Sequence, residues 1–344
     1  MVVLMALDHV RTFWYQGLQS PLDLTNTSPG LFMTRWITHL CAPLFFLLSG
    51  MSIYFLLKKC QSKKRVSKVL ILRGLLLILF EILIFSKIWI GEEGVILLQV
   101  LWALGCAMIT MAVLIWLKDW MIWLFSLSQI LGHNLLQEST GKLWSVFHIA
   151  HSNFQLLDTT VVVLYPLIPW LGVMSLGYLL GKLMNLETKN RIKWLTGIGS
   201  ASIVLFVFIR YSNSYGDPSP WQIYDNGLVT FLSFINCEKY PPSLLFLLIT
   251  LGLGFLMLGL LEWLIEKGGT KYFKLLELFG KVPLFFYLIH LPVILILKLV
   301  LAIDGVNLMG VYGAWGATLA ILYPVCKGYL VLKSNEKWSV LHYI

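Results

Sequence analysis

Several residues near the start of the chain have the types needed for acid–base chemistry, although they lie in otherwise apolar segments. Asp8, His9 and Arg11 interrupt "MALDHVRTFW", and Arg35 and His39 interrupt "TRWITHLCAPLFFLLSG". Imidazole changes its charge near neutral pH, so His9 and His39 are the candidate general bases. Adjacent helical residues do not face each other, so we expect Asp8 to pair with Arg35 or His39. The spacing predicts that Arg35 and His39 share one face of a helix.

Other polar side chains fall inside apolar runs further along the chain. A buried carboxyl such as Glu81 needs a partner or must hold its proton. Ionisable groups in apolar spans indicate functional sites, so the candidate site also includes Gln99, His133, Asn134 and His290. Arg11 and Arg35 have a second explanation, as anchors that extend to the membrane surface. His133 has a second explanation as an ordinary loop residue, and His290 has one as a hydrogen-bonded packing residue.

The composition of the chain is that of a membrane protein. Of its 344 residues, 58% are hydrophobic and 12% are charged, whereas soluble domains contain about 25% charged residues. The net charge of +9 would suit nucleic acid, but the basic residues lie in short loops between apolar runs. We therefore predict that the protein lies in a lipid bilayer and that it does not bind nucleic acid. The five cysteines form no CxxC pair, and no metal site is predicted.

Apolar runs long enough to cross a bilayer divide the chain into about ten predicted spans. The predicted fold is an all-α polytopic membrane bundle of about ten transmembrane helices. Residues 1–344 are predicted to form a single integral-membrane domain. The predicted spans cover residues 1–17, 34–57, 68–90, 94–117, 120–136, 159–184, 194–211, 243–264, 277–301 and 309–332.

The charges of the loops predict the orientation of these spans. Half of the lysines and arginines fall in loops 58–68, 182–193 and 266–274, which lie on one side if the spans alternate. Positively charged loops stay in the cytoplasm, so both chain termini are predicted to be cytoplasmic. The opposite loops, which include "YGDPSPW" and "KYPP", are predicted to face outwards. This orientation places the polar residues of the spans in the outer half of the membrane.

The first basic loop and the span after it carry positive charges that suit an anionic ligand. These residues are Lys63, Lys64, Arg65, Lys68 and Arg73. One interpretation is ordinary membrane topology. The other is a phosphate-binding site for a nucleotide-tailed donor such as coenzyme A. Neither GxGxxG nor GxxxxGK[ST] occurs, which excludes a Rossmann or P-loop site, and the GxSxG motif of α/β-hydrolases is also missing.

Eight motifs, in order, give the chain a family resemblance. They are "MALDHVR", "PLDLT…SP…TRWITHLCAPLFFLLSG", "LQVLWALG", "GHNLL", "YPLIPWLGVMSLGYLLG", "YGDPSPW", "KYPPSLLFLLITLG" and "FGKVPLFFYLIHLP". The chain resembles bacterial membrane proteins of the heparan-α-glucosaminide N-acetyltransferase catalytic-domain family, which are transmembrane acyltransferases. The resemblance covers nearly the whole chain.

The resemblance implies an acyltransferase of the bacterial inner membrane. An acetyl or other acyl group would move from cytoplasmic acetyl-CoA to an amine or hydroxyl of a sugar or glycan outside the cytoplasm. The lysosomal relatives acetylate the amine of terminal glucosamine. His9 or His39, with Asp8, would take the acceptor proton, and the other polar residues would bind the acceptor or the oxyanion. The basic residues after position 62 would hold the donor.

Two departures from the family pattern concern the catalytic base. Family members usually have an Asp-x-x-Arg-Gly segment before "MALDH", and the sequence starts after it. We expect either that residues precede Met1 or that part of the site is lost. The lysosomal branch has its favoured histidine in the outer loop after the first span, and loop 16–33 contains none. We therefore place the base on His9 first and on His39 second.

Two other functions remain open on the sequence. A secondary transporter would also have many spans and polar groups in the membrane, and prolines in the spans would allow broken helices. No repeat between the two halves supports this alternative. A catalytically inactive scaffold is the other alternative, because the Asp-x-x-Arg-Gly segment is missing. The sequence leaves homodimer formation, acyl length and the choice between N- and O-acylation undecided. It also leaves direct attack and an acyl-histidine intermediate as alternatives.

Overall fold

The computed structural model describes residues 1–17, 20–136 and 141–333. Residues 334–344, which form the predicted cytoplasmic tail, lie outside the described residues. The chain forms two compact units. The first unit consists of Met1–Cys41, Ile223–Asn236 and Leu261–Ile344, and the second consists of Ala42–Gln222 and Cys237–Leu260. Segments far apart in the sequence therefore combine within each unit.

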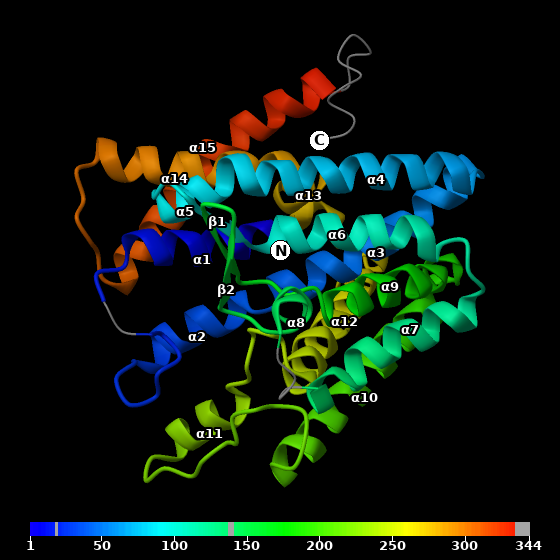
Figure 1. The fold of residues 1–344 in the computed structure, drawn as a ribbon, viewed down its shortest axis with the longest axis horizontal. Coiled ribbons are helices and arrows are strands. Elements are labelled where there is room, and N and C mark those ends of the chain that lie inside the picture. Colours follow the sequence, from blue (N-terminus) through cyan, green and yellow to red (C-terminus); the bar gives the residue numbers. More distant parts are fainter. Residues whose placement is uncertain (18–19, 137–140, 334–344) are drawn as a thin grey trace. The chain divides into compact units, whose positions relative to one another are not determined.

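The first unit is built around the N-terminal helix, α1 (Figure 1). Its elements are α1 (Val2–Trp14), α2 (Pro29–Thr38), α11 (Gly227–Ile235), η4 (Gly269–Phe273), α13 (Lys274–Lys281), α14 (Pro283–Val300) and α15 (Leu308–Lys333). Helix α1 packs against α2, α13, α14 and α15. Side chains donate hydrogen bonds to main-chain carbonyls at both ends of α1, from Trp315 to Val3, from Trp14 to Ile294 and from Lys298 to Phe13. These bonds fix α1 against its neighbours.

The second unit contains the middle of the chain and one later helix. Its elements are α3 (Cys41–Cys60), α4 (Lys63–Phe80), η1 (Glu81–Phe85), α5 (Ser86–Ile90), β1 (Val95–Leu98), α6 (Val100–Leu114), α7 (Asp119–Leu131), η2 (His133–Leu136), α8 (Lys142–Phe147), β2 (Ser152–Leu156), β3 (Thr159–Val163), α9 (Trp170–Leu180), η3 (Gly181–Asn185), α10 (Thr188–Ser212) and α12 (Leu244–Glu266). Helix α4 packs along α6, and α7 packs along α9 (Figure 1). The η1 turn is a π-helix inside an otherwise continuous helix.

Six helical segments of the described residues are long and apolar enough to cross a membrane, which confirms the all-α membrane bundle. They are Pro29–Cys60, Lys63–Ile90, Thr188–Ser212, Leu244–Glu266, Pro283–Val300 and Leu308–Lys333. The count of about ten spans is not confirmed. The expected spans 1–17 and 120–136 correspond to α1 and α7, which have 13 residues each.

Two other expected spans begin with a strand instead of a helix. Span 94–117 contains β1 before α6, and span 159–184 contains β3 before α9. Strand β3 pairs in parallel with β1 and antiparallel with β2, and Leu98, Val161 and Val163 form a small apolar core. A short apolar run is compatible with a buried strand and with a helix. The expected membrane spans at these positions are therefore replaced by a sheet and shorter helices.

The segment that carries Arg35 and His39 is broken between α2 and α3. Arg35 lies in the last turn of α2, His39 caps that helix, and α3 starts at Cys41. Pro43 has no N–H group to donate to the carbonyl of His39, so the helical hydrogen-bond pattern cannot continue through this point. The predicted span 34–57 is thus two helices, and the boundary between the two units falls at the same place.

Helices α3 and α9 of the second unit approach each other through glycines. A Cβ atom on Gly50 would lie 2.0 Å from the carbonyl oxygen of Met174. A Cβ atom on Gly177 would lie 2.0 Å from the carbonyl oxygen of Leu47. Small residues allow helix backbones to pack closely inside membranes. These two glycines therefore set the distance between α3 and α9.

Candidate active site

Asp8 is the centre of a mostly buried ion cluster in the first unit. Its Oδ1 accepts hydrogen bonds from Arg11 Nη2 and Thr38 Oγ1, both at 3.0 Å, and its Oδ2 accepts one from Arg35 Nη1 at 2.5 Å. Arg11 follows Asp8 by three residues, which places both on one face of α1, and α2 supplies the other two donors. Asp8 therefore pairs with Arg35, one of the two partners expected from the sequence.

The ion cluster holds two guanidinium groups next to one carboxylate. The exposed fractions of the side chains are 16% for Asp8, 9% for Arg11 and 13% for Arg35. Charge-assisted hydrogen bonds are stronger and better oriented than neutral ones, so the carboxylate fixes both guanidinium groups. Preorganised donors of this kind can stabilise a developing negative charge. The cluster thus has the chemistry of an oxyanion or anion site.

His9 belongs to a second polar group, which includes a histidine of α14. His9 Nδ1 lies 2.6 Å from His290 Nε2, and the two rings stack with centroids 4.9 Å apart. His290 is fully buried on α14, and its Nδ1 lies 2.6 Å from the carbonyl oxygen of Tyr287. The structure thereby brings together two candidate residues that are 281 positions apart in the sequence. The only signal for either was an imidazole in an apolar run.

His39 lies in the turn between α2 and α3 and is 2% exposed. Its main-chain N–H donates to the carbonyl of Trp36 at 2.9 Å. The preceding residue, Thr38, binds Asp8, so His39 is one position away from the ion cluster in sequence. Thr38 was not among the residues expected from the sequence, because a hydroxyl in an apolar helix gives no distinctive signal.

Glu81 and Gln99 lie together in the second unit, at the start of α6. Glu81 Oε2 accepts hydrogen bonds from the main-chain N–H groups of Leu101 and Trp102, at 2.8 and 3.2 Å. Gln99 occupies the N-cap position of α6, so Glu81 acts as the side chain that caps this helix. Glu81 is fully buried, and its Oε1 makes no hydrogen bond of normal geometry within the described residues. One carboxyl oxygen of Glu81 therefore serves as the cap of α6.

His133 forms another buried histidine pair, in the second unit, with His148. Nδ1 of His133 lies 3.0 Å from Nε2 of His148. His133 is 2% exposed and His148 is 1% exposed. Both lie outside the six candidate membrane helices. Burial, and secondly the nearby His148, lower the pKa of His133 to about 3 from an ordinary 6.5. Burial also lowers the pKa of His148. These imidazoles are therefore neutral at physiological pH.

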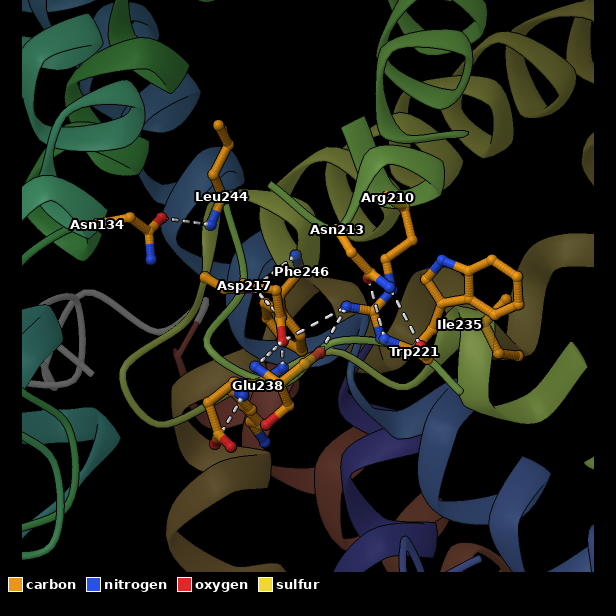
Figure 2. Close-up of polar contacts among 12 residues, drawn as sticks. Asn134, Arg210, Asn213, Asp217, Trp221, Ile235, Glu238, Leu244 and Phe246 are labelled. Carbon is orange, nitrogen blue, oxygen red and sulfur yellow. Dashed lines mark hydrogen bonds and ion pairs between the residues drawn. The ribbon is translucent and has the colours of Figure 1, made fainter. Parts of the chain in front are cut away.

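Asn134 has a structural role in the second unit. Its Oδ1 accepts a hydrogen bond from the main-chain N–H of Leu244 at 3.0 Å, at the first residue of α12 (Figure 2). The first N–H groups of a helix have no partner within the helix. Asn134 therefore satisfies one of them and ties η2 to α12.

The basic residues proposed for the donor lie on the first turns of α4, in the second unit. Lys63, Lys64, Arg65 and Lys68 are exposed, and Arg73 is half-buried. Ser62 caps the helix by accepting a hydrogen bond from the N–H of Arg65 at 3.3 Å. Lys63 also lies 5.9 Å from the ring centroid of Trp116, which is a cation–π contact. No acidic residue lies in this first turn, so its charge is uniformly positive.

A further buried ion pair, which the site prediction did not include, lies in the second unit. Asp217 accepts a hydrogen bond from the main-chain N–H of Glu238 at 2.9 Å (Figure 2). It accepts a second one from Ser243 Oγ at 2.6 Å. Arg210 Nη1 lies 3.6 Å from Asp217, and the side chains are 2% and 1% exposed. Arg210 also donates to the carbonyl of Ser219 at 2.8 Å.

This ion pair gives the aspartate of the "YGDPSPW" motif a structural role. Asp217 connects the end of α10 to the segment before α12, and its carboxylate is used by contacts within the protein. Buried charges persist in proteins when they are paired and hydrogen-bonded. We therefore treat Arg210 and Asp217 as part of the framework that holds these loops.

Together the six apolar segments and the buried polar groups define a mostly helical integral membrane protein. A family model described as heparan-alpha-glucosaminide N-acetyltransferase, catalytic, matches residues 2–212, which is more than half of the chain. The chain belongs to this family, as its motifs predicted, and the family is one of membrane acetyltransferases. Neither a curated protein nor a solved structure matches the chain. The matched residues include α1, α2 and the basic start of α4.

Proposed function

We propose that the protein transfers an acetyl group from acetyl-CoA to an amine or hydroxyl of a sugar or glycan. The observation that carries this proposal is the polar content of α1 in a chain of an acetyltransferase family. On this helix a hydrogen-bonded histidine, His9, directly follows the carboxylate that orients Arg11 and Arg35. Acyl transfer requires a proton acceptor and donors for an oxyanion, and α1 and α2 supply both.

The proposed reaction gives each of these groups a defined step. The acceptor nitrogen or oxygen attacks the thioester carbon, and its proton passes to His9, with His39 as the second candidate base. The carbonyl oxygen becomes an oxyanion that Arg11 or Arg35 stabilises. The carbon–sulfur bond then breaks, the nascent thiolate receives a proton, and the thiol of coenzyme A leaves. Asp8 positions the guanidinium groups through its hydrogen bonds.

The second unit supplies the proposed substrate-binding residues. The exposed cations at the start of α4 suit the phosphates of acetyl-CoA, and Arg73 continues this positive surface along the helix. Glu81 Oε1 and His133 Nε2 are buried polar atoms without a hydrogen bond in the described part of the chain. A buried polar atom gains stability when a ligand supplies its partner. We therefore retain both, with their neighbours Gln99 and Asn134, as acceptor-binding candidates.

The proposed orientation follows from the charge of the loops. Both termini and the start of α4 would lie in the cytoplasm, where acetyl-CoA is made, because positively charged loops remain there. The acceptor would be bound from the outer side of the bacterial inner membrane. Labelling of single cysteines placed at the exposed residues 63 and 225 in intact cells tests this arrangement. A reagent that cannot cross the membrane should modify only the variant at residue 225.

Calorimetry of acetyl-CoA binding, with desulfo-CoA as a control, tests the donor. The full chain in detergent should bind acetyl-CoA, and a His9→Ala/His39→Ala variant should bind it equally, because the histidines serve the chemistry. The wild type should acetylate D-glucosamine, used as the probe acceptor, and the variant should lose about 100-fold or more in rate. A folded wild type that does not bind acetyl-CoA contradicts the proposal. Uptake of the amino sugar by proteoliposomes would then favour the transporter.

A further inference from the structure

The two histidines of the first unit form a chain of hydrogen bonds that ends on a main-chain carbonyl. His9 Nδ1 and His290 Nε2 are 2.6 Å apart, and His290 Nδ1 is 2.6 Å from the carbonyl oxygen of Tyr287. The ring of His290 is stacked against Phe286, with centroids 5.8 Å apart, and packs edge-on against Tyr287 at 5.4 Å. His290 therefore has a fixed orientation in a fully buried position.

The carbonyl decides which ring nitrogens carry protons. A carbonyl oxygen only accepts hydrogen bonds, so the proton of neutral His290 lies on Nδ1. The Nε2 atom of His290 is then an acceptor, and the proton between the two rings belongs to Nδ1 of His9. Neutral His9 consequently carries its lone pair on Nε2. The directions of the hydrogen bonds that link His9, His290 and Tyr287 follow from the carbonyl of Tyr287.

Asp8 precedes His9 on α1, and adjacent helical residues point in different directions. The Asp8 carboxylate binds Arg11 and Arg35. A buried neutral imidazole thus takes the place that a carboxylate holds in a serine hydrolase, where it orients the catalytic histidine.

We propose that His290 is a positioning residue that fixes the tautomer of His9 and so makes Nε2 of His9 the proton acceptor of the transfer reaction. This inference rests on the proposed acyltransferase function and selects His9 over His39 as its base. The acceptor proton moves to His9 Nε2 as the acceptor attacks the thioester carbon. The imidazolium formed on His9 donates through Nδ1 to His290. When the carbon–sulfur bond breaks, the same proton leaves Nε2 for the sulfur atom, which restores neutral His9.

Two substitutions of His290 separate positioning from simple packing. Glutamine can accept from His9 Nδ1 with its side-chain oxygen and donate to Tyr287 with its side-chain amide, whereas leucine fills space without either contact. We expect His290→Leu to lower kcat for acetylation of D-glucosamine by about 100-fold, with an unchanged KM for acetyl-CoA. His290→Gln should recover at least about tenfold of that loss. The acid limb of the pH–rate profile should move in His290→Leu.

The control for these variants is His151→Asn, because His151 is an exposed histidine whose positive φ suits asparagine. It should leave rate and pH profile unchanged. Equal losses in His290→Leu and His290→Gln, or an unaltered pH profile in His290→Leu, would overturn the positioning role, because a packing role predicts no difference between an acceptor and an apolar side chain.

Nitrogen-15 spectra of the full chain labelled on its histidine rings provide a test that needs no activity. His9→Asn and His290→Gln variants assign the signals. Wild-type His9 should carry its proton on Nδ1, His290→Gln should preserve this state, and His290→Leu should lose it. A wild-type His9 with its proton on Nε2 would overturn the inference. If the spectra agree but no variant or wild type transfers acetyl groups, the proposed function fails while the tautomer assignment stands.

Discussion

At Asp8, one carboxylate orients two guanidinium groups and one hydroxyl. Asp8→Asn preserves the shape of the side chain but removes the charge that both arginines need. Breaking a buried ion pair costs about 3–5 kcal/mol, so we expect a stability loss near the lower end of that range. Acetyl transfer should fall by about 100-fold. Thermal unfolding in detergent and the D-glucosamine assay measure the two effects.

The matched control for Asp8→Asn is Asp304→Asn, which changes an exposed aspartate of the same unit. Exposed substitutions usually change stability by less than about 0.5 kcal/mol, and we expect no loss of transfer. If Asp8→Asn behaved like this control, the ion cluster would be an incidental contact.

The buried pair of His133 and His148 makes stability depend on pH. The pKa of His133 in the folded chain is about 3, below its ordinary value of 6.5, so the unfolded chain binds a proton that the folded chain does not. Stability is therefore full above the unfolded pKa and is lost as the pH falls towards the folded pKa. Lowering the pH from about 8 to about 5 should cost about 2 kcal/mol from His133 alone. Thermal unfolding over this range should show a smaller slope in His133→Gln, and an equal slope contradicts the argument.

Residue types were predictable from the sequence, but most partners were not. Asp8 was expected to pair with Arg35 or His39, because adjacent helical residues such as Asp8 and His9 do not face each other. The hydrogen bond from His9 to His290 joins residues 281 positions apart, and no local pattern indicates such a contact. Glu81 was expected to need a partner, but its use as a helix cap depends on how η1 and α6 pack.

At the scale of elements, the glycines between α3 and α9 make the sharpest prediction. In Gly177→Ala the new Cβ would meet the carbonyl oxygen of Leu47, a backbone atom, at 2.0 Å. We expect a destabilisation of about 1–3 kcal/mol, typical of overpacking. The control, Gly197→Ala in α10, has nothing within 4 Å and should stabilise by up to about 1 kcal/mol, because alanine favours helix. Unfolding temperatures that change in the same direction for both variants would contradict this interpretation.

Long apolar helices were predictable from the sequence, whereas interruptions were not. The segments Leu244–Glu266 and Leu308–Lys333 match expected spans because apolar runs of this length have few other stable structures. The strands β1 and β3 were expected as parts of spans, since short apolar runs do not distinguish strand from helix. The break between α2 and α3 has a cause in the sequence, namely Pro43, which cannot donate a helical hydrogen bond. The π turn at Glu81 has no sequence signature of its own.

For the whole molecule, the charge at the start of α4 has two explanations that a substitution can separate. Replacing Lys63, Lys64, Arg65 and Lys68 by glutamine should raise the KM for acetyl-CoA by about tenfold or more if these residues bind its phosphates. Salt should weaken binding in the wild type and have less effect in this variant.

The control for the α4 variant replaces Lys189 and Lys193 by glutamine. These are exposed lysines at the start of α10, on the side also predicted to be cytoplasmic. The control should leave KM unchanged. An equal effect of both replacements, or none from either, would leave membrane topology as the explanation of the α4 charges.

The hydrogen bond between His9 and His290 restricts which gene recombinations give a functional protein. The family match ends at residue 212, but the second imidazole comes from α14, well beyond it. A recombination event that exchanged the C-terminal part of the gene would separate the two rings. Functional chimeras should therefore be restricted to C-terminal parts from related genes that encode a histidine or glutamine at position 290. The two ends of the gene are thus expected to evolve together.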